Sequence, residues 1–383
     1  MDDKSSAQSL RQPVGVEYVN DYHNYLYSSS ASDTARQDKE YKYSDLLPTY
    51  PNILWPPLKL VGDLPEPGLQ VDDWRAGQLF KRSEIHSSDM SPSLGTEISN
   101  VDLCTLTLTE KNELGAMLAE RGLVVFRGQL NFTVDDQVNL VRHFGPLYKH
   151  PSAGIPSDDL SHIRVLYQGS EQKAPFGFTS SIKQWHHDSP YEQNPPGIVS
   201  MQLLCAPPSG GDTVFSSGYD TYDALSPGLQ KFVDTLHAEH RPGSIDALRD
   251  DLHIRRPNTS AVHPVICVHP VTGWKTTYVT STRYSTYGIL GLPQMESEML
   301  IEYMGMVART NVDAQVRLRW DEDTIALWDN RCVFHSATFN FWPHRRHGVL
   351  VSAISNKPLS VQDAQKTLSK EPTSRGNDTS RVS

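Results

Sequence analysis

Cysteine is scarce in this chain of 383 residues. Its four cysteines, Cys104, Cys205, Cys267 and Cys332, are far apart and form no C-x-x-C pair. They are too few to support a disulfide scaffold in a chain of this length. We therefore expect a reducing, intracellular setting, namely the cytoplasm.

Long apolar runs and a concentrated basic face are also missing. No 18 consecutive residues are apolar, and the first twelve residues, MDDKSSAQSLRQ, contain no apolar core segment. We expect neither a membrane span nor an export signal. The formal net charge of −10 and the pI near 5.8 argue against nucleic acid as a partner, because phosphate binding requires clustered basic side chains. The expected partner is a small molecule.

Composition divides the chain into three stretches. Residues 1–80 begin rich in Ser, Asp, Asn and Tyr and continue with many prolines, which predicts an extension that is partly disordered and partly wrapped on the body. Residues 81–357 carry the sustained apolar patterns of one large domain. Residues 358–383 are polar, and we expect this C-terminal tail to be frayed.

Several helices are expected within the large domain. Thr107 and Glu110 have the spacing of a capping box before an apolar stripe that Gly122 ends. A short buried strand, LVVF, follows at 123–126, and a second helical pattern runs from about 133 to 145. Further helices are expected over 219–240, 244–253 and 294–310.

After residue 160 the sequence changes to short apolar or alternating runs separated by Pro and Gly turns. These runs are IRVLY, GIVSMQLL, TVFSS, HPVICVHP, TTYVT, TIALW and GVLVSAI. Many short strands with long insertions predict a mainly β fold with helical insertions, built as an antiparallel barrel or jelly roll with helices packed outside.

The segment Trp-His-His-Asp at 185–188 carries the chemistry. His186 and Asp188 are two residues apart, so on a β-strand both would point to the same face and could hold one ion. His335 follows later in the chain, and Arg346 lies near it. Two imidazoles and one carboxylate on one side of a metal leave other positions open, which suits a non-haem Fe(II) that binds a co-substrate and dioxygen.

Seven landmarks give the sequence a family resemblance. In order they are LGTEISNVDL, VVFRGQ, HFGPLYKHP, QWHHD, PPSGGDTVFSSGYDTYDALSP, AVHPVICVHPVTG and WDNRCVFHSATFNFWPHRRH. From about residue 85 to 356 the chain resembles the taurine dioxygenase (TauD/TfdA) family of Fe(II)- and 2-oxoglutarate-dependent oxygenases, particularly its fungal-type sulfonate dioxygenase-like members. The resemblance implies a double-stranded β-helix core and a reaction that uses Fe(II), 2-oxoglutarate and O2.

The resemblance also assigns roles to individual residues. His186, Asp188 and His335 match the family's three iron ligands, and Thr213 and Arg346 match the positions that bind the distal carboxylate of 2-oxoglutarate. The chemistry agrees, because a guanidinium forms two charge-assisted hydrogen bonds with a carboxylate and a threonine hydroxyl can add another.

The substrate positions depart from the taurine-oxidising pattern. His150 matches a histidine that contacts the sulfonate, but Leu350 stands where those relatives have an arginine, and Ile182 stands where they have an asparagine. On a strand Leu350 should face the cavity about 13 Å along from Arg346, and an apolar side chain cannot pair with a sulfonate. Phe178 belongs to a segment for which two roles stay open, a lid over the cavity and an ordinary surface loop.

We therefore expect oxidation of a C–H bond in a small molecule other than taurine, giving succinate and CO2. An aliphatic amino acid or an intermediate of specialised metabolism fits best, and an alkyl sulfonate held by another cation is the alternative. Hydroxylation, desaturation and oxidative cyclisation all stay open.

Other interpretations remain beside this one. The same three ligands could activate water in a divalent-metal hydrolase, or the chain could be a barrel that binds a ligand without catalysis. Trp185 is expected to wall the site, and Asp329 and Asn330 to brace the metal ligands. Family relatives often self-associate, so a homo-oligomer is expected.

Overall fold

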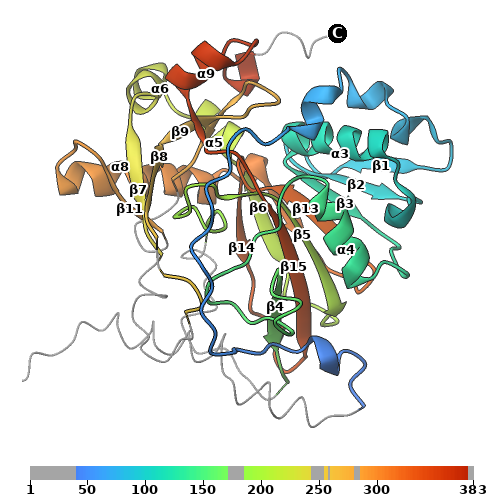
Figure 1. Cartoon of the computed structure of the whole chain (residues 1–383). Coiled ribbons are helices and arrows are strands. Elements are labelled where there is room, and N and C mark those ends of the chain that lie inside the picture. The colour runs from blue at the N-terminus through green and yellow to red at the C-terminus, as the bar shows by residue number, and fades with distance from the viewer. Residues whose placement is uncertain (1–39, 171–184, 243–253, 258, 280–284, 378–383) are drawn as a thin grey trace, which may run out of the picture.

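A seven-stranded sheet forms the larger layer of the fold in this computed structural model, which describes residues 40–170, 185–242, 254–257, 259–279 and 285–377 (Figure 1). The strands run in the spatial order β1-β2-β3-β13-β5-β15-β4, and all neighbours are antiparallel except β2 and β3. Their bounds are β1 (His86–Asp89), β2 (Thr96–Ser99), β3 (Leu123–Phe126), β4 (Ile163–Gln168), β5 (Pro196–Cys205), β13 (Ile325–Asp329) and β15 (Arg346–Ile354).

A three-stranded sheet packs against one face of the larger one. It consists of β12 (Gln315–Leu318), β6 (Thr213–Ser217) and β14 (Val333–Ala337), with β6 in the middle. Apolar side chains from both sheets meet in one interior core, which includes Met201 of β5 and Phe215 of β6. This is the jelly-roll arrangement that the sequence predicted.

Strand alternation separates this interior from a second core. On β15, Val349 and Val351 join the core beneath the helices, whereas Leu350 between them joins the interior core. Successive side chains of a strand point to opposite faces, so an uninterrupted apolar run can serve both cores. The prediction that Leu350 faces the interior is confirmed.

Two helices, α3 (Leu108–Arg121) and α4 (Val134–Arg142), lie beside the larger sheet (Figure 1). The predicted capping box is present at the start of α3, where Thr107 and Glu110 bond each other's backbone amides. Gly122 ends the helix at φ 69°, a conformation that glycine adopts without strain. The second helix ends at Arg142 rather than at residue 145.

The remaining elements form smaller layers around the barrel. Helix α8 (Gln294–Thr310) has the predicted bounds. Two three-stranded sheets have the orders β11-β7-β8 and β10-β9-β16. The bounds are α5 (Gly218–Asp223), α6 (Pro227–Val233), β7 (His237–His240), β8 (Ala261–Pro264), β9 (Ile266–Val268), β10 (Lys275–Thr277), β11 (Thr286–Ile289), β16 (Leu359–Ser360) and α9 (Val361–Thr367). Short 3-10 helices are η1 (Ser44–Leu46), η2 (Pro67–Gln70), η3 (Trp74–Ala76), η4 (Leu79–Lys81), η5 (Leu103–Thr105), η7 (Val312–Ala314) and η8 (Arg375–Asn377).

The predicted helical insertion over 219–240 is wrong at its C-terminal end. Residues 237–240 form β7, because Ala238 and His240 are buried by pairing with β8 and β11 on either side. Tertiary pairing thus overrides the local pattern. The run HPVICVHP is divided between β8 and β9. The helix expected over 244–253 lies wholly outside the described residues.

Both flanking segments lie against the barrel where the structure describes them. Residues 40–80 form an arm: Thr49 makes a bridge with Ile155, and Glu66 pairs with Arg331 at 2.8 Å. The expectation of a frayed C-terminal tail is wrong for residues 359–377, since this segment adds β16 and α9 to the fold and buries Ala364 completely.

Two further expectations concern disulfides and membrane-spanning helices. All four cysteines lie in the described part of the chain, and none forms a disulfide there. Among the helices of the described ranges, none is both long enough and apolar enough to cross a bilayer.

Candidate metal centre and substrate pocket

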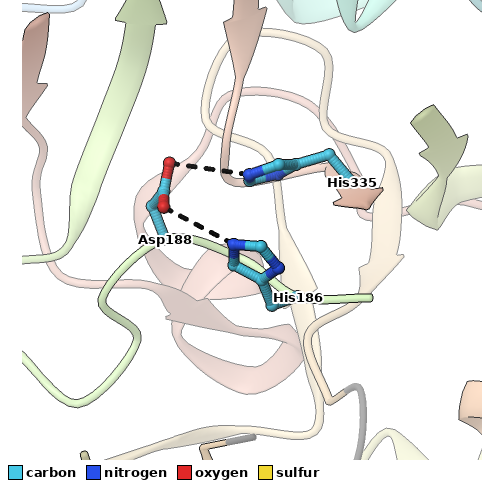
Figure 2. Close-up of side chains that lie close together, drawn as sticks. All are labelled: His186, Asp188 and His335. Atoms are coloured by element: carbon cyan, nitrogen blue, oxygen red, sulfur yellow. Dashed lines mark ion pairs between the residues drawn. The ribbon is translucent and has the colours of Figure 1, made fainter. Parts of the chain in front are cut away.

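His186 and Asp188, two residues apart, meet the sequence-distant His335 inside the barrel. Figure 2 shows the carboxylate of Asp188 with one oxygen toward each of two imidazoles. The Nε2 of His186 lies 3.7 Å from Oδ1, and the Nε2 of His335 lies 3.8 Å from Oδ2. These distances exceed hydrogen-bond length, and all the candidate ligand atoms lie within 4.8 Å of one another. One ion between them could contact all three.

The local backbone differs from the predicted strand. His186 makes only an isolated bridge with His335, through reciprocal backbone hydrogen bonds of 3.0 Å, and Ser189 at φ 46° turns the chain immediately afterwards. The i, i+2 argument therefore selected two side chains that the structure also brings together, but the β-strand that it assumed is wrong. His187 points elsewhere: its Nδ1 donates to the carbonyl of Asn330 at 2.6 Å.

Asn330 holds this loop in place. Its side-chain oxygen accepts from the backbone N–H of Asp188 at 2.7 Å, and its Nδ2 donates to the carbonyls of Asp188 and Pro196. Asn330 is fully buried, so each bond replaces one that water would otherwise make. The predicted bracing by Asn330 thus acts through the backbone of the loop.

The environment sets the charge of each candidate ligand. Burial lowers the pKa of His335 well below its usual value, so its imidazole is neutral and can donate a lone pair. Burial alone would raise the pKa of the Asp188 carboxyl, but His335, His186 and the Arg164 guanidinium together hold it below its ordinary value. A neutral imidazole and an ionised carboxylate are the forms that bind a divalent metal.

The donor set fits an iron site by its own chemistry. Oδ2 of Asp188 and Nδ1 of His335 are buried and have no hydrogen-bond partner among the described residues. A buried carboxylate oxygen without a partner is costly, and a bound cation would relieve that cost. Two imidazoles and one carboxylate form the facial set of non-haem Fe(II) oxygenases.

Arg346 and Thr213, the two residues predicted to bind 2-oxoglutarate, are the first residues of β15 and β6. Arg346 is largely buried, and its Nε donates to the carbonyl of Gly211 at 3.0 Å. The hydroxyl of Thr213 accepts from Nε1 of Trp320 at 3.0 Å. Because its oxygen is already accepting, the Thr213 hydroxyl is oriented to donate its own hydrogen to another acceptor.

A narrow pocket opens beside the metal residues. His150, Leu350 and Asp188 all line it, together with Arg164. The structure therefore brings the predicted substrate residues His150 and Leu350 to one wall of the candidate metal centre. Ile182 and Phe178, the other two predicted substrate residues, lie outside the described residues.

Two predicted supporting residues have different surroundings. Trp185 packs with Phe334 and Ala308, which fits a wall beside the loop. The carboxylate of Asp329 is taken up by His269 and Arg331, at 2.9 and 2.6 Å.

Asp329 thus belongs to a separate buried network. It is connected to the loop that carries His186 and Asp188 through its sequence neighbour Asn330. Asp329, His269 and Cys332 also lie close enough to suggest a second metal group. Arg331 already supplies the positive charge there, so Asp329 forms a structural ion pair with Arg331 and a hydrogen bond with His269.

Sequence reasoning missed Arg164 and Trp320. Arg164 lies in IRVLY, where a charged residue between apolar ones is typical of a solvent-facing strand position. Its Nη1 is instead 3.1 Å from Oδ1 of Asp188. The sequence does not show that β4 pairs with β15, and this pairing is what places Arg164 beside Leu350.

Comparison with known proteins gives consistent matches. The model of the family described as "Taurine catabolism dioxygenase TauD, TfdA family" matches residues 86–351. An alpha-ketoglutarate-dependent sulfonate dioxygenase of Saccharomyces cerevisiae is 32% identical over 335 residues, which cover 83% of this chain and 79% of that protein. An alpha-ketoglutarate-dependent dioxygenase of Penicillium expansum is 32% identical over 335 residues, covering 82% and 89%.

Solved structures of members of the same family are similar to this chain. A taurine dioxygenase from Burkholderia xenovorans has a TM-score of 0.60 at 26% identity, covering 73% of this chain and 94% of that one. Alpha-ketoglutarate is 2-oxoglutarate, the co-substrate that the sequence predicted.

Proposed function

Because this chain belongs to the TauD, TfdA family and is an Fe(II)- and 2-oxoglutarate-dependent dioxygenase, we propose that it oxidises a C–H bond of a small molecule bound between His150 and Leu350. Dioxygenase activity excludes the hydrolase and the non-catalytic barrel. The observation that carries the proposal is the shared pocket, in which these two side chains and Asp188 form one lining.

Each residue of the centre has a proposed task. His186, Asp188 and His335 would hold Fe(II). When bound, iron, 2-oxoglutarate and O2 supply an oxidant that removes hydrogen from an unactivated C–H bond, with succinate and CO2 as co-products. Arg346 and Thr213 would hold the far carboxylate of 2-oxoglutarate, since a buried guanidinium and a donating hydroxyl complement a carboxylate. The apolar interior would exclude water.

The substrate determines how the pocket is used. Leu350 is almost fully buried in the interior core, so it favours an apolar portion of the substrate at that place. An aliphatic amino acid or an intermediate of specialised metabolism provides such a portion, and so does an alkyl sulfonate. The relative that is called a sulfonate dioxygenase supports the alkyl sulfonate, whereas the name of the other relative specifies no substrate.

Anaerobic titration tests the metal and co-substrate part of the proposal. Addition of Fe(II) and then 2-oxoglutarate should produce a weak visible charge-transfer band. The band should be lost in His186→Ala and in Arg346→Ala, because the first removes a ligand and the second removes the carboxylate anchor. Arg345→Ala is the matched control, since that arginine stacks on Tyr41 at 4.2 Å. Iron-loaded protein without a band would refute the proposal.

A substrate screen separates the candidates. Succinate release is measured with aliphatic amino acids and with alkyl sulfonates under saturating 2-oxoglutarate. Efficient turnover of simple sulfonates by the unmodified protein would overturn the amino-acid prediction. Product mass then separates hydroxylation, which adds one oxygen, from desaturation and ring closure, which both remove two hydrogens, and a proton NMR spectrum of the product separates those two.

A further inference from the structure

We infer that the exposed face of α8 is the surface through which two copies of this chain form a two-fold symmetric dimer, with their α8 helices packed antiparallel. This face, the α8 stripe, consists of Met295, Met299, Tyr303 and Met306. Figure 1 shows α8 in orange at the edge of the molecule, on the side away from α3 and α4.

The α8 stripe lies opposite the side of the helix that packs on the rest of the protein. That packed side carries four buried residues at intervals of four, four and three, which are Ser297, Ile301, Gly305 and Ala308. The stripe has the same intervals but is displaced by two residues, and two residues turn an α-helix by about 200°. The stripe and the packed side are therefore opposite faces of α8, and the described part of the chain covers only the second.

The exposure of the stripe points to a partner. Met295 and Met299 are 76% and 70% exposed, and Met306 and Tyr303 are 45% and 41% exposed. Single exposed apolar side chains are ordinary, but a contiguous apolar surface marks an interaction site. This one runs for about 16 Å along the helix axis. Methionine is unbranched and flexible, so it adapts its shape to a facing side chain.

The charges along one edge of the stripe favour an antiparallel second copy. Glu298 lies in the first half of this edge, Glu302 at its middle and Arg309 near its end. In an antiparallel pair the same edges of the two helices face each other, so Arg309 approaches the partner subunit's Glu298. Arg309 also pairs with Glu302 of its own helix at 2.6 Å, and a guanidinium has enough donors to bridge two carboxylates.

Other arrangements and occupants are less favourable. A parallel pair would place the like charges of the two Glu298 side chains together and align the two helix dipoles. The glutamates beside the stripe and the net charge of −10 oppose binding to an anionic membrane surface.

The surface needed for a stable dimer extends past both ends of the helix. A specific interface of standard size covers about 800 Å² on each partner, which is more than one short helix face supplies. Leu290 is 49% exposed just before α8, and Val312 is 75% exposed just after it. Antiparallel packing brings the Val312 end of one helix to the Leu290 end of the other, so both apolar side chains enlarge the contact.

Sedimentation equilibrium of the full chain tests the inference. From about 1 to 100 µM the unmodified protein should have twice the monomer mass of 42.9 kDa, because interfaces of standard size bind with micromolar or lower dissociation constants. A monomer throughout this range would overturn the inference, whether the stripe is then covered by another protein or by none.

Two charge variants test the surface itself. M299E and M306E should each weaken the dimer by about 100-fold or more, because two carboxylates would be enclosed in one apolar interface. The matched control is L130E, since Leu130 is 84% exposed in the turn before α4, and it should remain a dimer. A urea midpoint is recorded for each variant to verify folding. Dimers of unaltered affinity in both folded methionine variants would refute the role of the stripe.

Disulfide trapping tests the antiparallel orientation. A two-fold axis through the middle of the stripe places Met299 opposite Met306 of the partner subunit. With the exposed Cys104 replaced by serine, oxidation of M299C/M306C should yield a covalent dimer on a non-reducing gel, whereas M299C alone should not. No covalent dimer from the double variant, or an equal yield from M299C alone, would overturn the antiparallel arrangement.

Discussion

Gly211 gives a sharp test of how Arg346 is positioned. It lies in the turn before β6 at φ +67°, and a Cβ added there would lie 3.0 Å from Cδ of Arg346 and 3.1 Å from Cδ1 of Phe341. Its carbonyl also accepts from Nε of Arg346. Gly211→Ala therefore has two costs: about 1–2 kcal/mol for a left-handed backbone, and about 1.5–3 kcal/mol if the charged hydrogen bond is lost as Arg346 moves.

The matched control is Gly128→Ala. Gly128 has a similar φ of +73°, but an added Cβ would meet nothing within 4 Å. It should lose about 1–2 kcal/mol of unfolding free energy and keep its affinity for 2-oxoglutarate. Gly211→Ala should bind 2-oxoglutarate about 10- to 100-fold more weakly, as measured by the charge-transfer titration, with the urea midpoint recorded for both. If both variants bind 2-oxoglutarate equally well, Arg346 is not the anchor or Gly211 does not position it.

Three further predictions concern the surroundings of the centre. Asn330→Ala removes the amide that holds the backbone of Asp188 and should weaken metal binding about 10- to 100-fold; unchanged affinity in a metal titration would contradict this bracing role. Arg331→Met leaves Asp329 buried with a lost ion pair and should cost about 3–5 kcal/mol in urea unfolding, so a loss below 1 kcal/mol would refute the network. Burial lowers the pKa of His347 from 6.5 to about 4, so the unfolded state takes up a proton first. Stability should be full above pH 6.5 and fall toward pH 4, by about 3 kcal/mol for this group. His347→Gln should show a correspondingly shallower loss in urea titrations at pH 7 and pH 4, and an identical loss would count against this assignment.

Local signals were sufficient where an element depends on its own sequence. The capping box at Thr107, the glycine at 122 and the stripe of α8 all act within a few residues, and the structure confirms each. Local sequence signals failed where pairing with other strands determines the secondary structure. Residues 237–240 become a strand because β8 and β11 lie beside them.

The same limit applies to the site. The ligand spacing and the resemblance predicted three metal ligands, and the structure brings their side chains together. The spacing could not show that His186 meets His335 through a single bridge. Nor could it show that Arg164 is paired with Leu350, because their contact depends on which strands are neighbours.

The position of Glu66 has a practical consequence for anyone trimming this protein. The family match begins at residue 86, yet Glu66, upstream of it, forms an ion pair with Arg331. Arg331 also pairs with Asp329. The residue after Asp329, Asn330, holds the backbone of Asp188. A fragment cut at the family boundary would expose this interior ion network to water and lose its counter-charge. An expressed fragment should therefore start well before residue 66. If a shorter fragment loses iron, the cause would be the disrupted ion network of Arg331 and Asp329 and not the absence of a metal ligand.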